Sequence, residues 1–177
     1  MVNSPLKLLT DFKPFKDQRG TFQKIFRSDL LKQKYGFCEE WKESFISFSE
    51  PNVIRGLHFQ LPPADHWKLV TCISGQILDV CVDIRKSSTF GKVESFILSE
   101  SNGNALLIPP GFAHGFKTLS DERAGLLYFT TAEHDPKLDS GILWDSIGFD
   151  WKLENKKPVL SDRDAKFVKL CDFKSPF

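Results

Sequence analysis

The sequence predicts an all-β fold, an antiparallel barrel or sandwich, and two observations lead to this class. Short segments that alternate apolar and polar residues recur along the chain with turn residues between them, which is typical of strands. Helix start and stop signals frame only one short segment before residue 132. With 177 residues, the chain is long enough to bury a sizeable core, and we expect a single domain over residues 1–177.

The N-terminal part predicts an arm followed by a short strand. Residues 1–15 alternate loosely and suit an edge strand or an arm. A turn is expected at residues 18–20, because Gln-Arg-Gly separates two such segments. The strand that follows this turn should contain Phe22 and Phe26.

Residues 28–37 predict a short helix, and residues 41–49 predict a strand. Ser28 suits the N-cap of the helix, since its hydroxyl can accept a hydrogen bond from a free backbone N–H. Gly36 is expected to end the helix, because glycine adopts the left-handed conformation that often follows a last turn. The strand signal is the alternation of aromatic or apolar residues with polar ones in WKESFISFS.

The central part of the chain predicts a run of strands, and the C-terminal part predicts loops. The expected strands cover residues 68–74, 76–84, 92–98 and 126–131, with two more in ALLIPPGFAHGF. Residues 132–177 show little periodicity. They are expected to form loops and a short helix near residues 162–170 that packs on the barrel.

Composition excludes several classes of function. The chain carries 24 basic and 23 acidic residues, so it has no electrostatic footprint for nucleic acid. Apolar runs stay shorter than the ~18 residues that a membrane span needs, and no secretory signal is apparent. Cys72 and Cys81 lie within apolar strand patterns, which predicts buried free thiols in a reducing compartment. We therefore expect a cytoplasmic protein that contacts neither nucleic acid nor membrane.

The segment RGLHFQLPPADHWK, residues 55–68, concentrates polar side chains among apolar ones. Arg55, His58, His66 and Lys68 would each be costly to bury without a partner. An imidazole titrates near neutrality, and an ammonium among apolar groups can stabilise an anion. The hypothesis is that His58 and Lys68 face one pocket inside the barrel.

A second pattern combines Gly103, Pro109, Gly111 and His114. Its spacing resembles most of the second motif of the cupin superfamily, which implies a jelly-roll barrel with His114 pointing inward. Metal-binding cupins carry a Glu seven residues before a Gly in their first motif, and here that position is Lys68. A zinc or iron site usually needs three or more protein ligands, and an ammonium would repel a cation, so we expect no metal.

Tyr128 lies on a later strand in the run LLYFTT, where phenylalanine would serve packing equally well. Taken alone, Tyr128 is a core aromatic with its hydroxyl at the rim, and His58 is a satisfied histidine between two apolar neighbours. Taken with Lys68, the two residues supply a base, an acid and a cation. Such a set favours proton transfer through an anionic intermediate.

The chain resembles the dTDP-4-dehydrorhamnose 3,5-epimerase family in a series of motifs: RGLHFQ, PP, KLV…SGQILDV, DIRKSSTFG, IPPGFAHGF, the Tyr128 strand and LSDRDA. The motifs follow in order from about Asp17 to Leu170. The resemblance implies a cupin-type antiparallel β-barrel with a few short helices. It also implies an epimerase that inverts C3, C5 or both of a nucleotide-linked 4-keto-6-deoxy sugar, without a cofactor, in deoxysugar biosynthesis for surface polysaccharide.

The same resemblance implies roles for four residues. His58 matches the base that removes a proton next to the C4 ketone, and Asp164 matches the acid residue that orients it. Lys68 matches the cation that stabilises the enolate oxygen. Tyr128 matches the proton donor on the other face of the sugar. His66 is given no role, because its spacing matches neither the metal motif nor the family's base.

Further matches concern substrate binding. Arg19, Arg55 and His114 match phosphate or sugar contacts, and Gln60 belongs to the RGLHFQ motif. Phe22 is similar to a residue that contacts the base from the neighbouring subunit. The resemblance therefore implies a homodimer in which the N-terminal arms are exchanged.

The chain departs from the family pattern at several expected contacts. Lys24 replaces a usual Glu, and Glu43 and Ser47 lie in a strand that usually reads Q-x-N-x-S-x-S. His134 replaces a second tyrosine, so inversion at both C3 and C5 stays open. Leu143 replaces an Arg. These changes leave the base open and would suit a GDP- or CDP-linked sugar, including a heptose. The expected partner is therefore a 4-keto sugar linked to dTDP or GDP.

Two other readings stay open. A related cupin 3,4-ketoisomerase would use the same enolate chemistry, although motif order and the place of Tyr128 favour the epimerase. A non-catalytic sugar-binding cupin would keep the pocket, but binding alone needs no acid–base pair.

Overall fold

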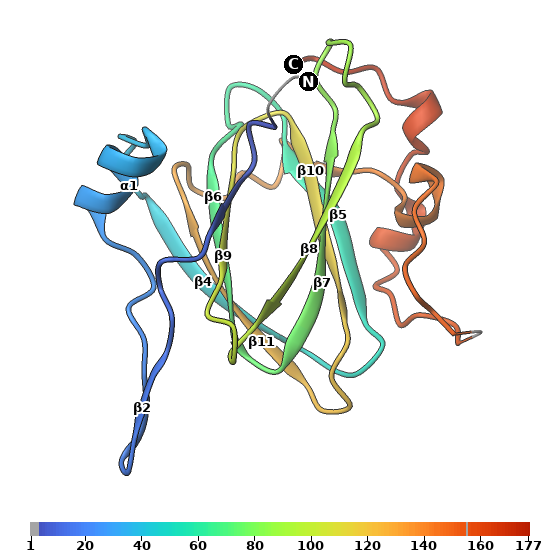
Figure 1. Cartoon of the computed structure of the whole chain (residues 1–177). Helices are drawn as coiled ribbons and strands as arrows, with labels where there is room; N and C mark the ends of the chain where they lie inside the picture. The colour runs from blue at the N-terminus through green and yellow to red at the C-terminus, as the bar shows by residue number, and fades with distance from the viewer. Residues whose placement is uncertain (1–3, 155) are drawn as a thin grey trace.

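The computed structural model describes residues 4–154 and 156–177. Two five-stranded sheets face each other, and a two-stranded ribbon projects from their side (Figure 1). The first sheet has the strand order β1-β9-β6-β11-β4, and the second has the order β12-β5-β10-β7-β8. Every pairing within these sheets is antiparallel, so the predicted all-β jelly-roll class is confirmed.

The strands are β1 (Lys7–Leu9), β2 (Phe15–Asp17), β3 (Gly20–Phe22), β4 (Glu43–Ser49), β5 (Ile54–Gln60), β6 (Lys68–Ser74), β7 (Gln76–Asp83), β8 (Val93–Ser99), β9 (Ala105–Ile108), β10 (Phe112–Thr118), β11 (Ala124–Thr130) and β12 (Asp139–Gly141). The helices are α1 (Ser28–Tyr35) and three 3₁₀ helices, η1 (Trp144–Ile147), η2 (Asp164–Lys166) and η3 (Leu170–Asp172). The expected central strands are therefore confirmed within a few residues, and β5 was not predicted.

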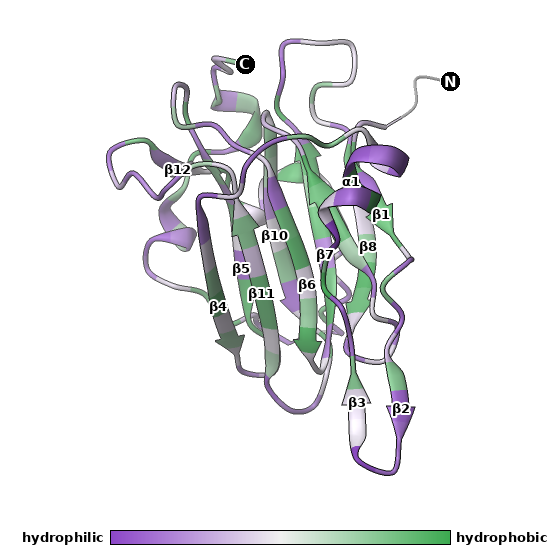
Figure 2. Cartoon of the chain, turned by 90° about the vertical axis from the view of Figure 1, so that its left-hand side faces the viewer, coloured by the Kyte–Doolittle hydropathy of each residue, from purple (hydrophilic) through white to green (hydrophobic). Residues whose placement is uncertain are grey.

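Apolar and polar residues alternate along the strands (Figure 2). This alternation gives one inner core and two outer ones. Val70 and Leu106 point between the sheets, whereas Leu69 and Leu107 point outward and are covered by the segment around α1. Full burial of such a side chain contributes roughly 1.5–3 kcal/mol relative to leaving it exposed. The predicted burial of two free thiols is confirmed, because Cys72 and Cys81 are both buried.

The α1 helix ends as predicted but does not begin as predicted. Gly36 follows it with a φ of 71°, in the left-handed conformation. The prediction that Ser28 is the N-cap is wrong, because Ser28 is already helical and the extended Arg27 holds that position. Within the described residues, no helix is long and apolar enough to cross a membrane.

The N-terminal segment forms an edge strand and then a hairpin. Strand β1 pairs with β9 at the edge of the first sheet, so the expectation of an edge strand within residues 1–15 is confirmed. Strands β2 and β3 form the projecting ribbon. The expectation that Phe26 belongs to the second of these strands is wrong, since Phe26 lies beyond β3 and packs against Trp41 and Phe129.

The C-terminal segment covers the outer face of the second sheet (Figure 1, orange to red). Ile147 and Trp151 pack against Leu57 of β5 there. The prediction of one short helix near residues 162–170 is wrong, because this segment forms only the three-residue 3₁₀ helices η2 and η3. The Leu143 N–H donates to the Val168 carbonyl at 2.8 Å, which holds the chain extended between η2 and η3.

Candidate active site

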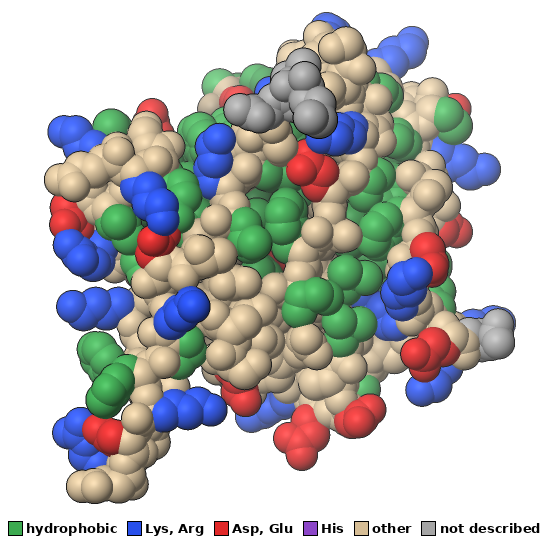
Figure 3. Space-filling model, viewed as in Figure 1, with side chains coloured by type: hydrophobic (Ala, Val, Ile, Leu, Met, Phe, Trp, Pro, Cys, Tyr) green, Lys and Arg blue, Asp and Glu red, His purple; other side chains and the backbone are tan. Residues whose placement is uncertain are grey.

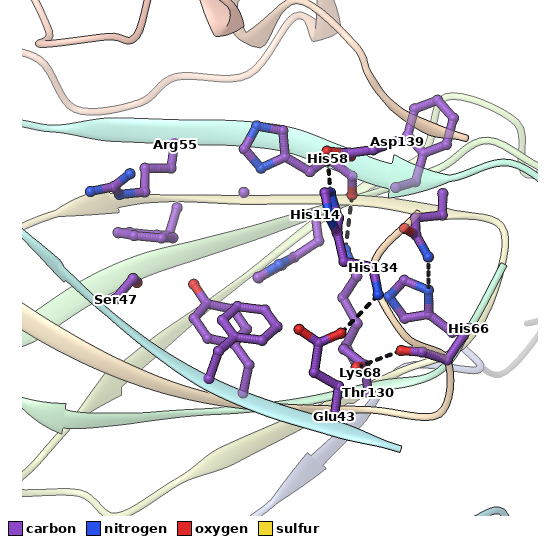
Figure 4. A pocket seen from close by; sticks show the side chains of 17 residues that line it. Glu43, Ser47, Arg55, His58, His66, Lys68, His114, Thr130, His134 and Asp139 are labelled. Atoms are coloured by element: carbon purple, nitrogen blue, oxygen red, sulfur yellow. Dashed lines mark hydrogen bonds and ion pairs between the residues drawn. The ribbon is translucent and has the colours of Figure 1, made fainter. Parts of the chain in front are cut away.

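A cavity of about 260 Å³ lies between the sheets, and all four histidines of the chain line it. Figure 4 shows these side chains around the cavity, with His58 on β5, His114 on β10, and His66 and His134 in loops. His58 and Lys68 are both in its wall, so the hypothesis that they face one pocket is confirmed.

A β-bulge turns Arg55 and His58 to the same side of β5. On the paired strand β10, His114 faces His58 and Phe116 faces Arg55, so two steps on β10 match three on β5. Side chains three residues apart in a regular strand point to opposite faces, and the extra residue removes this difference. Gly56 occupies the bulge with a φ of 112°, where a Cβ would lie 2.7 Å from the backbone of β10.

His58 is held by a carboxylate from the C-terminal segment. Its Nε2 lies 2.9 Å from Asp164 Oδ1, and the other oxygen of Asp164 accepts the Gly56 N–H at 2.9 Å. The segment reaches β5 because the Ile54 N–H donates to the Val159 carbonyl at 3.0 Å. Burial is the largest single influence and raises the pKa of Asp164, but the hydrogen bond and charge of His58, with the hydrogen bonds of Gly56 and Ser161, together outweigh it and lower that pKa.

Lys68 is the first residue of β6 and points into the cavity. Its Nζ donates to the backbone carbonyl of His58 at 3.2 Å, which places the ammonium beside β5, the strand that carries His58. Burial lowers the pKa of Lys68 to about 8, while the negative charges of Asp139 and Asp79 oppose this shift. The ammonium is therefore still the major form at pH 7.

Tyr128 enters the cavity on β11, which lies beside the β6 strand of Lys68 in the sheet that faces His58. Its ring stacks on Phe45 of β4, with 4.6 Å between the ring centres. Burial raises the pKa of Tyr128 above its usual 10, and the nearby Ser47 hydroxyl opposes part of that rise. The phenol is therefore neutral at physiological pH and keeps a proton to donate.

His114 belongs to a buried group with Asp79 and Cys81 on the neighbouring β7. Its Nε2 lies 2.8 Å from Asp79 Oδ2, and the three side chains offer ligand atoms within 4.8 Å of one another. Such atoms could hold a zinc ion. However, the Lys68 ammonium is close enough to be stabilised by both Asp79 and Cys81, and its charge opposes a second cation.

A polar network forms the rim of the cavity. His134 donates its backbone N–H to Glu43 at 2.8 Å, and its ring lies 3.0 Å from Asp139. Arg163 pairs with the same Asp139 oxygen at 2.7 Å. Gln60 is buried below this rim and accepts the backbone N–H of Asp135 at 2.6 Å.

The structure separates the predicted contacts into two groups. Arg55 and Ser47 line the cavity with Glu43, Gln60, His114 and His134. Arg19 and Phe22 instead line a shallow surface pocket on the β2–β3 hairpin, and Lys24 lies in a neighbouring one. These three residues are therefore not brought to the cavity of their own chain.

The sequence reasoning missed two side chains that line the cavity, His66 and Asp139, and a third, Asp79, that is buried behind His114. Asp79 was detectable, because it is a lone acid at an inward position between Ile77 and Cys81 in QILDVCVD. His66 was set aside on spacing alone, yet it lines the cavity. Asp139 lies in a segment without periodicity, so no signal marked it.

Comparison with known proteins gives concordant results. The chain matches the model of the family described as dTDP-4-dehydrorhamnose 3,5-epimerase over residues 6–172. The Shigella flexneri protein of that name is 43% identical over 171 residues, which cover 95% of this chain and 93% of the relative. The crystal structure of dTDP-6-deoxy-D-glucose-3,5-epimerase RmlC from Legionella pneumophila, in complex with dTDP-4-keto-L-rhamnose, has a TM-score of 0.90 and 33% identity, covering 98% of this chain and 92% of that chain. The dTDP-4-dehydrorhamnose 3,5-epimerase of Bacillus anthracis, with TDP and PPi bound, has a TM-score of 0.85 and 36% identity, covering 93% of each chain.

Asp164→Asn should change the acid dependence of stability. Because the pKa of Asp164 is lowered in the folded protein, its carboxylate stabilises the fold above pH ~4 and loses this effect as the pH falls. The difference in the free energy of unfolding between wild type and variant should therefore shrink from pH 7 to pH 3. Urea unfolding across this range measures it, and a difference independent of pH would refute the assignment.

Proposed function

The chain belongs to the dTDP-4-dehydrorhamnose 3,5-epimerase family, and we propose that its substrate is a dTDP-linked 4-keto-6-deoxy sugar. It is an epimerase that inverts C3, C5 or both of a nucleotide-linked 4-keto-6-deoxy sugar. One observation carries the assignment of roles. His58 and Tyr128 enter one cavity from opposite sheets, and the Lys68 ammonium lines the same cavity from the sheet of Tyr128.

His58 removes the proton from the carbon next to the ketone. Its Nε2 is bonded to Asp164, so Nδ1 is the nitrogen that carries the free lone pair. The carboxylate orients the ring and stabilises the imidazolium that forms when the proton is taken. Deprotonation beside a ketone involves no change of oxidation state, so side chains alone can perform this step.

Lys68 stabilises the negative charge that develops on the ketone oxygen. A cation placed in a partly water-excluded cavity interacts more strongly with such charge than it would in water. The enolate also favours the protonated form of Lys68, whose pKa is about 8 before substrate is bound.

Tyr128 returns a proton from the other face of the enolate. A phenol is a far stronger acid than a C–H bond beside a ketone, even when burial raises its pKa. Because the donor and the base occupy facing sheets, the new C–H bond forms opposite the old one. The result is inversion rather than simple exchange.

Arg55 contacts the diphosphate in this proposal. Its guanidinium donates to Ser49 Oγ at 2.7 Å and to the Phe48 carbonyl at 3.1 Å, which leaves other N–H donors for phosphate oxygens. Figure 4 places Arg55 and Ser47 at one end of the cavity and His134 and Glu43 at the other. Gln60 and His114 lie in the wall with them and contact the sugar.

We also propose a homodimer in which the β2–β3 hairpin reaches the cavity of the partner. Phe15 and Phe22 expose 62% and 63% of their surface on a hairpin that projects from the body (Figure 3). Phe22 would stack on the base there, with Arg19 and Lys24 near the nucleotide. Sedimentation at the mass of one chain would contradict this assembly.

Incubation with dTDP-4-keto-6-deoxyglucose in deuterated water tests the chemistry. NMR should show deuterium at C3, C5 or both. His58→Asn should slow this exchange by about 10²–10⁴-fold, the usual contribution of a general base. Tyr128→Phe should keep the exchange at the face of the sugar next to His58 and lose inversion, because the opposite face then lacks a proton donor.

Each alternative gives a different outcome in this experiment. Wild-type protein without any incorporation would support a sugar-binding protein, and migration of the ketone to C3 would indicate a ketoisomerase. Normal inversion by Tyr128→Phe would show that another residue is the acid.

A panel of nucleoside diphosphates tests the proposed base. A ligand that binds only the folded protein raises the melting temperature by an amount that grows with its affinity. At equal concentration, dTDP should give a larger shift than UDP, CDP or GDP. A larger shift with GDP would assign the change at Lys24 to a different nucleotide.

A further inference from the structure

His66 borders the cavity with a ring whose two nitrogens have different surroundings. Nδ1 lies 2.9 Å from the Ala64 carbonyl oxygen and 3.2 Å from Gln60 Nε2. Among the described residues, Nε2 makes no hydrogen bond to the protein. The ring therefore keeps one polar atom free at the cavity wall.

The surroundings of Gln60 decide where the proton of His66 lies. The Gln60 amide oxygen accepts the Asp135 N–H at 2.6 Å, so the amide cannot be turned around. Its two N–H groups have carbonyl acceptors, Ala64 at 2.9 Å and Glu133 at 3.2 Å. Nδ1 of His66 is thus not needed as an acceptor, and it donates its proton to the Ala64 carbonyl.

This tautomer makes Nε2 a hydrogen-bond acceptor. Burial, with the nearby Lys68 charge, lowers the pKa of His66 to about 4, so the ring is neutral when the enzyme works. A neutral acceptor repels phosphate and carbonyl oxygens, which are also acceptors. The partner it fits is a hydroxyl group.

We propose that His66 is a specificity-determining residue whose Nε2 accepts a hydrogen bond from a hydroxyl group of the sugar. The proposal rests on the proposed function for the identity of the ligand, a nucleotide sugar. His66 and Lys68 lie at the end of the cavity away from Arg55 (Figure 4). The hydroxyl contact therefore marks the sugar end, and the guanidinium marks the diphosphate end.

Calorimetric binding of dTDP and dTDP-glucose tests the proposal without requiring turnover. His66→Phe keeps a planar ring and removes the acceptor, so it should weaken dTDP-glucose by about tenfold and leave dTDP unchanged. His66→Gln, which restores an acceptor, is the matched control and should stay within about twofold of wild type for both ligands.

Monodeoxy analogues of dTDP-glucose then identify the hydroxyl. For wild type, one analogue should bind about tenfold more weakly than dTDP-glucose. For His66→Phe, the same analogue should bind as tightly as dTDP-glucose, because the substitution and the missing hydroxyl remove the same hydrogen bond. Unchanged affinity of His66→Phe for dTDP-glucose, or equal losses for both ligands, would overturn the proposal. Failure of the wild type to turn over any 4-keto sugar would instead reject the proposed function, and the binding result would stand.

Discussion

Burial of charge between two apolar sheets is the constraint that shapes this cavity. An ammonium or a carboxylate removed from water is stable only when a partner replaces the lost hydration. Lys68 meets that condition through the His58 carbonyl and the charges of Asp79 and Asp139. Asp164 meets it through His58 and the Gly56 N–H. The polar groups therefore depend on one another, and each fixes the position of the next.

The parts that follow from alternation were predictable from the sequence. Lys68 and Val70 share the inner face of β6 while Leu69 lies outside, as a period of two requires. The Pro-Gly turn before β10 directs His114 inward for the same reason. Gly36 ends α1 because the left-handed conformation after a helix suits glycine. Local rules decide these features, so the local sequence contains them.

Other features depend on contacts that the local sequence does not contain. Period two places Arg55 and His58 on opposite faces, and only the bulge at Gly56 brings both to the cavity. Asp164 could be assigned only through the family resemblance, because 106 residues separate it from His58. His66 was set aside on spacing, although its ring is held at the cavity by the hydrogen bond that Nδ1 donates to the Ala64 carbonyl.

The unequal exposure of the proposed base and acid bears on how the enzyme resets. One inversion leaves His58 with an extra proton and Tyr128 without one. The His58 side chain is 32% exposed, so its imidazolium can lose the proton to solvent. Tyr128 is only 7% exposed, and burial raises its pKa, so a phenolate there is costly and is driven to recover a proton. The burial that makes Tyr128 a weaker acid in the forward step thus favours its recovery afterwards.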